Sequence, residues 1–170
     1  MGGVSLFDQI VESPEEWTGA RVVDEVALAQ YSGPDRRRDP GLPAWLRNVL
    51  VLCDFDTHLQ MEGFLGWWEN RALVDASLVV DALRSVGMQT DAQLLQAACD
   101  VLAESQLDSN LPLEPWAVSS FAERHPALSS KQYDSLQDIE GRLYLNEPDG
   151  PDLYAALVSH AASGLAVNWS

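Results

Sequence analysis

The chain has 170 residues, of which 46% are hydrophobic and 21% are charged, so one domain of ordinary size can bury a core without disulfides or metal ions. Its 26 acidic residues outnumber its 10 Lys and Arg residues, and the formal net charge is -16 with a pI near 4.2. This charge argues against direct binding to nucleic acid or to an anionic membrane surface, because either contact would need a basic patch.

The cysteines and the N-terminus indicate the compartment. Cys53 and Cys99 have no paired spacing, so we expect two reduced thiols in apolar helical surroundings. The first residues lack a basic region followed by an apolar run, and no stretch approaches the roughly 18 uninterrupted apolar residues of a membrane span. We therefore expect a cytoplasmic protein without membrane contact.

Helix signals begin at Ser13-Pro14-Glu15-Glu16, which combines an N-cap, a proline at the first helical position and a glutamate three residues after the cap. This pattern predicts a helix start, and Gly19 is expected to divide that helix from one over residues 21–31. The next segment, residues 32–41, is rich in turn formers and contains the Arg36-Arg37-Arg38 cluster between aspartates. We expect this cluster to be a solvated loop.

Leu42-Pro43 opens a predicted helix that is suited to the centre of the protein. Its apolar residues form one broad face: Trp45, Leu46, Val49, Leu50, Leu52, Cys53, Phe55 and Leu59. We expect this helix to break at Glu62-Gly63-Phe64. A helix over residues 74–86 follows, with Gly87 as its C-cap.

The remaining helices are marked by their caps. Thr90 with Gln93 forms a capping box, and Ser129 with Gln132 forms another. Between these two helices, residues 111–126 contain three prolines and predict an irregular connection. Gly150-Pro151-Asp152 is expected to start the last helix.

Strand-like alternation is scarce, so the sequence predicts an all-α fold, a single compact domain of about six to eight helices over residues 1–170. Within it, residues 1–41 are expected to form an N-terminal helical extension and loop. Residues 42–163 are expected to form the helical core. No internal repeat or low-complexity run indicates another architecture.

The segment from Val49 to Thr57 suggests one enzymatic alternative. Its Asp54-Phe55-Asp56-Thr57 end resembles the first motif of the haloacid-dehalogenase phosphatases, in which the first aspartate is the nucleophile, the second is the acid/base and magnesium is bound. That family continues with Gly-Thr where this chain has Thr57-His58, and the glycine permits a sharp turn beside phosphate. The motif also needs a lysine within βα units, whereas Lys131 is the only lysine.

Other catalytic patterns are missing from the sequence. It has no GxSxG, P-loop or GxGxxG motif, and His58, His125 and His160 lack the spacing of metal ligands. We therefore expect a protein that is not an enzyme and uses no cofactor or metal.

Acidic residues recur at helical spacing. Asp100, Glu104 and Asp108 repeat every four residues, and Asp134 with Asp138 repeats that spacing later. Such like-charged pairs cost an isolated helix a few tenths of a kcal/mol each, so they do not help the fold. Their bases stand about 5–6 Å apart, near the ~7 Å between successive phosphates of a strand. An acidic face of this kind could imitate nucleic acid, or it could serve solubility or salt adaptation only.

The aromatic tract from Glu62 to Asn70 allows two interpretations, a tight helix-to-helix turn closed by buried rings or an aromatic contact surface. The run from Phe55 to Asn70 also resembles the helical family of bacterial DNA mimic protein 19. The resemblance continues at residues 80–88, 92–95, 133–138 and 151–154, and it covers about residues 43–163. Its motif in this tract consists of Glu62, Gly63, Phe64, Trp67, Trp68 and Asn70.

The family resemblance implies an α-helical protein that can dimerise and, in the namesake member, an acidic surface that occupies a DNA-binding transcription factor. His58 stands where the family usually has an acid, and Met61-Glu62-Gly63 replaces a more polar turn, so this chain is a divergent member. We expect an acidic interaction module for a basic protein, with contacts through Asp100, Glu104, Asp108, Asp134 and Asp138. A magnesium-dependent phosphatase using Asp54 and Asp56, and a structural homodimer or immunity- or antitoxin-like partner, remain alternatives.

Overall fold

The structure is a computed structural model that describes residues 5–104, 128–143 and 152–167, and every regular element in these ranges is a helix. The elements are α1 (Leu6–Glu12), the 3-10 helix η1 (Pro14–Glu16), α2 (Gly19–Ala29), α3 (Ala44–Ser85), α4 (Gln89–Glu104), α6 (Ser130–Arg142) and α7 (Leu153–Val167). The predicted all-α fold is confirmed. None of the described helices is long and apolar enough to span a membrane.

α3 is two helices joined at a kink. Gly63 has φ 71° and ψ 176°, a conformation outside the helical region that side chains with a Cβ rarely adopt. The predicted break at this glycine is confirmed. We call residues 44–62 the first arm of α3 and residues 64–85 the second arm.

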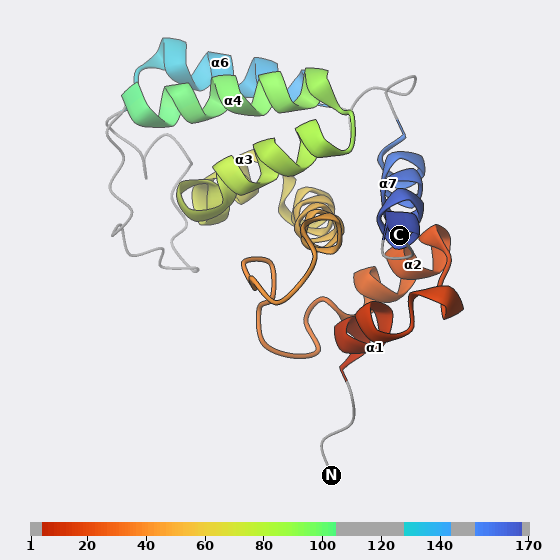
Figure 1. Ribbon diagram of the computed structural model, residues 1–170. Coiled ribbons are helices and arrows are strands. Elements are labelled where there is room, and N and C mark those ends of the chain that lie inside the picture. The colour runs from red at the N-terminus through yellow and green to blue at the C-terminus, as the bar shows by residue number, and fades with distance from the viewer. Residues whose placement is uncertain (1–4, 105–127, 144–151, 168–170) are drawn as a thin grey trace.

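The helices surround the two arms in two groups (Figure 1). α4 packs along the second arm of α3, and α6 lies on α4. α2 and α7 pack against each other and against α3, while α1 contacts α2. The N-terminal helices belong to the core, because Ile10, Val22 and Val26 are fully buried.

Two glycines let helices approach closely. A Cβ on Gly19 would meet the Val158 carbonyl oxygen of α7, and a Cβ on Gly164 would meet the Trp45 ring of the first arm. At the kink, the rings of Phe55 and Trp67 meet edge to face with centroids 4.8 Å apart. These contacts tie α7 and both arms into one core.

The helix ends follow the predicted caps in part. Ser129 and Gln132 form the expected capping box, and the Asp152 carboxylate accepts from the Ala155 backbone N–H at the start of α7. Ser13 precedes a helical turn that begins at Pro14, as predicted, but this is only the 3-10 helix η1, without a side-chain cap from Ser13, and α2 is capped separately by Thr18. Between them, Trp17 is extended and buried, so the chain leaves the helix to place this ring in the core.

The C-terminal half also departs from the sequence-based boundaries. α4 begins at Gln89, so Thr90 lies inside the helix rather than before it. α3 ends at Ser85, and Gly87 with φ 87° follows as predicted. The predicted irregular connection over residues 111–126 lies outside the described residues.

The kink generates a stability prediction. We expect Gly63→Ala to lower the free energy of unfolding by about 1–3 kcal/mol, because alanine is strained at this backbone conformation. Gly141→Ala is the control, since its Cβ would enter open space on α6. We expect that variant to be unchanged or up to about 1 kcal/mol more stable in urea unfolding. Equal stability of both variants would contradict a kink that requires glycine.

Candidate functional site

Asp54 and Asp56 lie on a helix and face different surroundings. Two residues along an α-helix differ by about 200° in direction, so these carboxylates cannot share one small site. Asp54 contacts Arg37, whereas Asp56 lines a cavity beside α2 and α7. The phosphatase alternative does not fit this geometry, because that motif needs a strand with both aspartates at one phosphate. The described residues contain no strand.

Arg37 holds together both arms of α3. Its Nη1 lies 2.7 Å from Asp54 Oδ2 on the first arm and 2.7 Å from Asp75 Oδ2 on the second arm. The side chains of Asp54 and Asp75 are only 7% and 3% exposed, respectively. Asp35 accepts from Nε and Nη2 of the same guanidinium, and its hydrogen bonds, with the charges of the two buried aspartates, raise the pKa of Arg37.

The expectation that the arginine cluster is a solvated loop was wrong for two of its three members. The side chain of Arg37 is 13% exposed, and that of Arg36 is 20% exposed and paired with Asp8 and Asp39. Arg38 is 56% exposed and lies 3.5 Å from Asp75. The flanking charges suggested solvation, but the two buried carboxylates that pair with Arg37, those of Asp54 and Asp75, come from distant positions in the chain.

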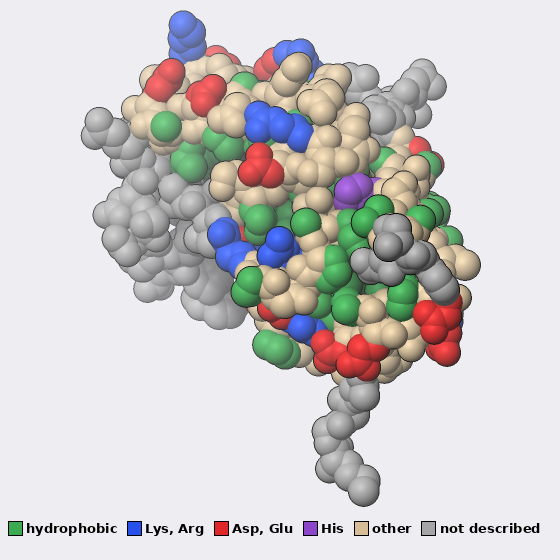
Figure 2. Space-filling model, in the orientation of Figure 1, with side chains coloured by type: hydrophobic (Ala, Val, Ile, Leu, Met, Phe, Trp, Pro, Cys, Tyr) green, Lys and Arg blue, Asp and Glu red, His purple; other side chains and the backbone are tan. Residues whose placement is uncertain are grey.

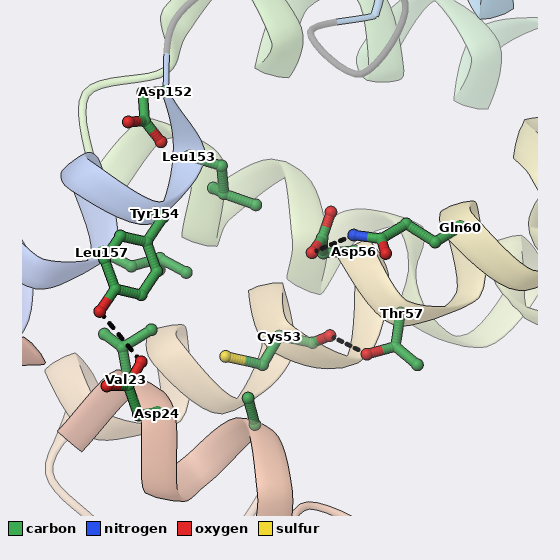
Figure 3. A pocket seen from close by; sticks show the side chains of 11 residues that line it. Val23, Asp24, Cys53, Asp56, Thr57, Gln60, Asp152, Leu153, Tyr154 and Leu157 are labelled. Carbon is green, nitrogen blue, oxygen red and sulfur yellow. Dashed lines mark hydrogen bonds between the residues drawn. The ribbon is translucent and has the colours of Figure 1, made fainter. Parts of the chain in front are cut away.

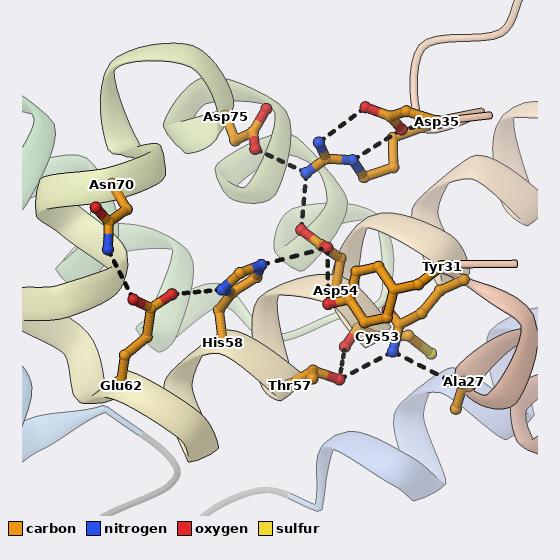
Figure 4. A network of polar contacts seen from close by, with 12 residues as sticks. Ala27, Tyr31, Asp35, Cys53, Asp54, Thr57, His58, Glu62, Asn70 and Asp75 are labelled. Atoms are coloured by element: carbon orange, nitrogen blue, oxygen red, sulfur yellow. Dashed lines mark hydrogen bonds and ion pairs between the residues drawn. The ribbon is translucent and has the colours of Figure 1, made fainter. Parts of the chain in front are cut away.

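The polar contacts continue along the first arm to the kink (Figure 4). Tyr31 donates its hydroxyl to Asp54 at 3.1 Å, and His58 Nε2 lies 3.7 Å from the same carboxylate. His58 Nδ1 contacts Glu62, whose other oxygen accepts from Asn70 Nδ2 at 2.7 Å. The bond between Glu62 and Asn70 therefore bridges the two arms on either side of Gly63.

The aromatic part of the family-like tract lies in the core. Phe64 and Trp68 are each 2% exposed, and Trp67 is fully buried. Trp67 also contacts Phe64 with ring centroids 6.1 Å apart. These three rings are therefore not an exposed contact surface, and their contribution is the packing around the kink.

The predicted partner-binding acids lie on two neighbouring helices. Asp100 and Glu104 are exposed on α4, and Asp134 and Asp138 are exposed on α6. Each pair lies opposite the buried side of its helix, where Leu95 and Leu136 pack. Asp138 pairs with Arg142 at 3.2 Å, and Asp100 accepts from Gln96 at 3.3 Å, both at the surface. Asp108 lies outside the described residues.

Basic side chains form no broad patch on the face shown in Figure 2, where they lie in small groups, most of them beside acidic ones. The two described histidines lie on different helices: His58 is on α3, and His160 is on α7 next to Asn48. His125 lies outside the described residues. In the part of the chain that the structure describes, no three His, Cys, Asp or Glu side chains are placed to hold a metal ion.

A cavity of about 580 Å³ lies between α2, the first arm of α3 and α7 (Figure 3). No sequence pattern predicts this cavity, because its walls come from separate parts of the chain. The one local signal was the stripe of Cys53, Asp56, Thr57 and Gln60 along one side of the first arm. The residues that line it are Val23, Asp24, Ala27, Cys53, Asp56, Thr57, Gln60, Asp152, Leu153, Tyr154 and Leu157.

The described residues form an acidic, all-helical structure in which Arg37 joins the buried Asp54 and Asp75, while Asp100, Glu104, Asp134 and Asp138 are exposed. A family model described as DMP19-like protein matches residues 40–160, which is more than half of the chain. The chain therefore belongs to the DMP19-like protein family. No curated protein and no solved structure matched it.

The role of Arg37 can be tested by substitution. We expect Arg37→Met to lower the free energy of unfolding by about 3–5 kcal/mol, because it removes the cation that lies between the buried carboxylates of Asp54 and Asp75. Arg38→Met is the control and should cost less than about 1 kcal/mol, since that side chain is mostly exposed. Urea unfolding measures both, and similar losses in the two variants would contradict the bridge.

Cys53 gives a prediction of pH dependence. Burial raises the pKa of its thiol to about 12, and the charges of Asp56 and Asp54 act in the same direction. The reactive thiolate is therefore scarce at pH 8, and we expect alkylation by iodoacetamide to be roughly a hundredfold slower than for a free cysteine. The rate, followed by mass spectrometry of the Cys53 peptide, should rise about tenfold per pH unit between pH 7 and 9. A rate that levels off by pH 9 would contradict the raised pKa.

Proposed function

We propose that this protein is a non-enzymatic acidic interaction module of the cytoplasm that occupies the DNA-binding surface of a basic protein. Asp100 and Glu104 on α4, with Asp134 and Asp138 on α6, are the contact residues that we propose among the described residues. Family membership supports a helical module of the DNA-mimic kind. The observation that supports this surface most directly is that all four carboxylates are exposed on helices that pack side by side.

The three clustered arginines lie against carboxylates other than the acids of α4 and α6. Arg36 and Arg37 pair with carboxylates of the same chain, and Arg38 lies near one. These three side chains are three of the ten Lys and Arg residues, which stand against 26 acidic residues, so the chain keeps a formal net charge of -16. A strongly negative surface attracts a basic partner over a distance of about 8–10 Å at physiological ionic strength.

The spacing of the carboxylates fits the chemistry of the proposed partner. A DNA-binding surface presents Arg and Lys side chains at intervals set by the phosphate backbone. Carboxylates four residues apart on a helix stand about 5–6 Å apart at their bases, and longer Arg and Lys side chains can adapt to that interval. The helices hold these acids at fixed intervals, so binding does not require the acidic surface to fold first.

The proposal is tested by capture and competition. We expect the immobilised protein to retain a basic DNA-binding protein from bacterial lysate at low ionic strength and to displace that partner from its DNA in fluorescence anisotropy. The affinity should fall roughly tenfold or more between about 50 and about 200 mM NaCl, because the contact is electrostatic. Failure to retain any basic protein at low salt would contradict the proposal, as would a partner that still binds its DNA.

Matched charge variants test whether the partner contacts the acids of α4 and α6 or responds only to the total negative charge of the protein. The triple variant Asp100→Asn, Glu104→Gln, Asp134→Asn should bind the partner about tenfold more weakly. The triple variant Glu12→Gln, Glu15→Gln, Glu16→Gln removes the same charge from exposed residues at the N-terminal end and should change the affinity less than about twofold. Equal losses in both variants would mean that the acidity acts only as bulk charge. A homodimer held by apolar contacts would not show the steep salt dependence.

A further inference from the structure

The cavity between α2, the first arm of α3 and α7 combines an apolar wall with a polar one (Figure 3). Val23, Leu153 and Leu157 are buried residues that line it, and together they provide aliphatic surface. The polar wall includes Asp24, Asp56 and Asp152. Among the described residues that line the cavity there is no Lys or Arg to balance the three carboxylates.

Two of these carboxylates are held in place by neighbours. Gln60 Nε2 donates to Asp56 Oδ2 at 2.8 Å, and the Tyr154 hydroxyl donates to Asp24 Oδ1 at 2.9 Å. A carboxylate accepts several hydrogen bonds, so each can take further N–H donors besides the bond that it has. The donors, Gln60 and Tyr154, are uncharged, so these hydrogen bonds do not neutralise the two carboxylates.

The thiol of Cys53 is a second, independent feature of the same cavity. It is 6% exposed and is drawn toward the cavity in Figure 3. The Cys53 sulfur has no hydrogen-bond partner among the residues that the structure describes, although its backbone carbonyl accepts from Thr57. A buried polar group of this kind that faces a cavity is available to contact whatever enters it.

The three helices around the cavity also expose large apolar side chains. Tyr154 of α7 lines the cavity and is 48% exposed. Leu28 of α2 follows Ala27 of the lining and is 80% exposed, and Met61 of α3 follows Gln60 and is 78% exposed. Of these three, Tyr154 is the one that lines the cavity, and an exposed aromatic side chain at a pocket is typical of a surface that contacts another protein.

We propose that this cavity receives an arginine side chain of a bound protein, with the guanidinium between Asp24 and Asp56 and the aliphatic stem against Val23, Leu153 and Leu157. An arginine matches both walls, because its stem is apolar and its planar head offers five N–H donors to carboxylates. Buried arginines in pockets are frequent centres of binding energy at protein interfaces. The inference names a second contact for the partner of the proposed function and rests on that function only for the source of the arginine.

The cavity can be tested without the partner by using N-butylguanidinium, which carries the stem and head of arginine alone. We expect a saturable shift of the Gln60 side-chain amide and of the Cys53 backbone amide in ¹H–¹⁵N NMR spectra of the full chain. Asp56→Asn should weaken binding about tenfold, since it removes one charged acceptor. Asp24→Asn is a second variant with the same expectation, and Asp81→Asn, an exposed acid paired with Arg84, is the control and should leave the affinity unchanged.

Two further probes distinguish the contribution of the apolar wall to binding from that of the polar wall. The bare guanidinium ion lacks the stem and n-butanol lacks the charge, so we expect both to bind at least tenfold more weakly than N-butylguanidinium. The proposal is overturned if n-butanol binds equally well, if Asp81→Asn weakens binding as much as Asp56→Asn, or if the Gln60 and Cys53 signals do not shift. If the probe binds but no basic protein is captured, the arginine site is supported and the proposed function is rejected. If a basic protein is captured but the probe does not bind, the proposed function is supported and the arginine site is rejected.

Discussion

The placement of one guanidinium constrains much of this structure. Arg37 lies between two buried carboxylates, Asp54 and Asp75, that belong to different arms of α3. Removing buried charges from water costs several kcal/mol per ion, and only close opposite charges offset that cost. The loop that carries Arg37 therefore has to dock on the arms, and the arms have to meet at an angle that brings both aspartates to one cation.

The kink makes this arrangement geometrically accessible. A straight helix of 42 residues would place Asp54 and Asp75 roughly 30 Å apart along its axis. Gly63 turns the chain so that both reach Arg37, while the bond between Asn70 and Glu62 and the contact between the Phe55 and Trp67 rings close the inside of the bend. The family-like tract thus determines the shape of the scaffold, and Asp54 of the segment that resembled a phosphatase motif stabilises that shape through Arg37.

Because the interior uses the buried aspartates and two of the three clustered arginines, contact with a partner depends on other residues. The acids of α4 and α6 lie on helices that pack on the second arm, whereas the cavity lined by Asp24 and Asp56 lies beside the first arm, α2 and α7. The kink thus places two separate acidic features on one rigid scaffold. Both are suited to positively charged groups, one as an exposed row of carboxylates and the other as a partly apolar pocket.

The sequence by itself determined the helical class, the break at Gly63, the capping box at Ser129 and the solvent-facing spacing of Asp100, Glu104, Asp134 and Asp138, because these depend on residues within a few positions of one another. Local patterns could not show that Arg37 is buried, since Asp54 and Asp75 lie 17 and 38 residues away from it in the chain. Only the tertiary structure decided which acids are interior and which charges remain outside. It also assembled the cavity, whose three walls meet only after α2 and α7 pack on the first arm.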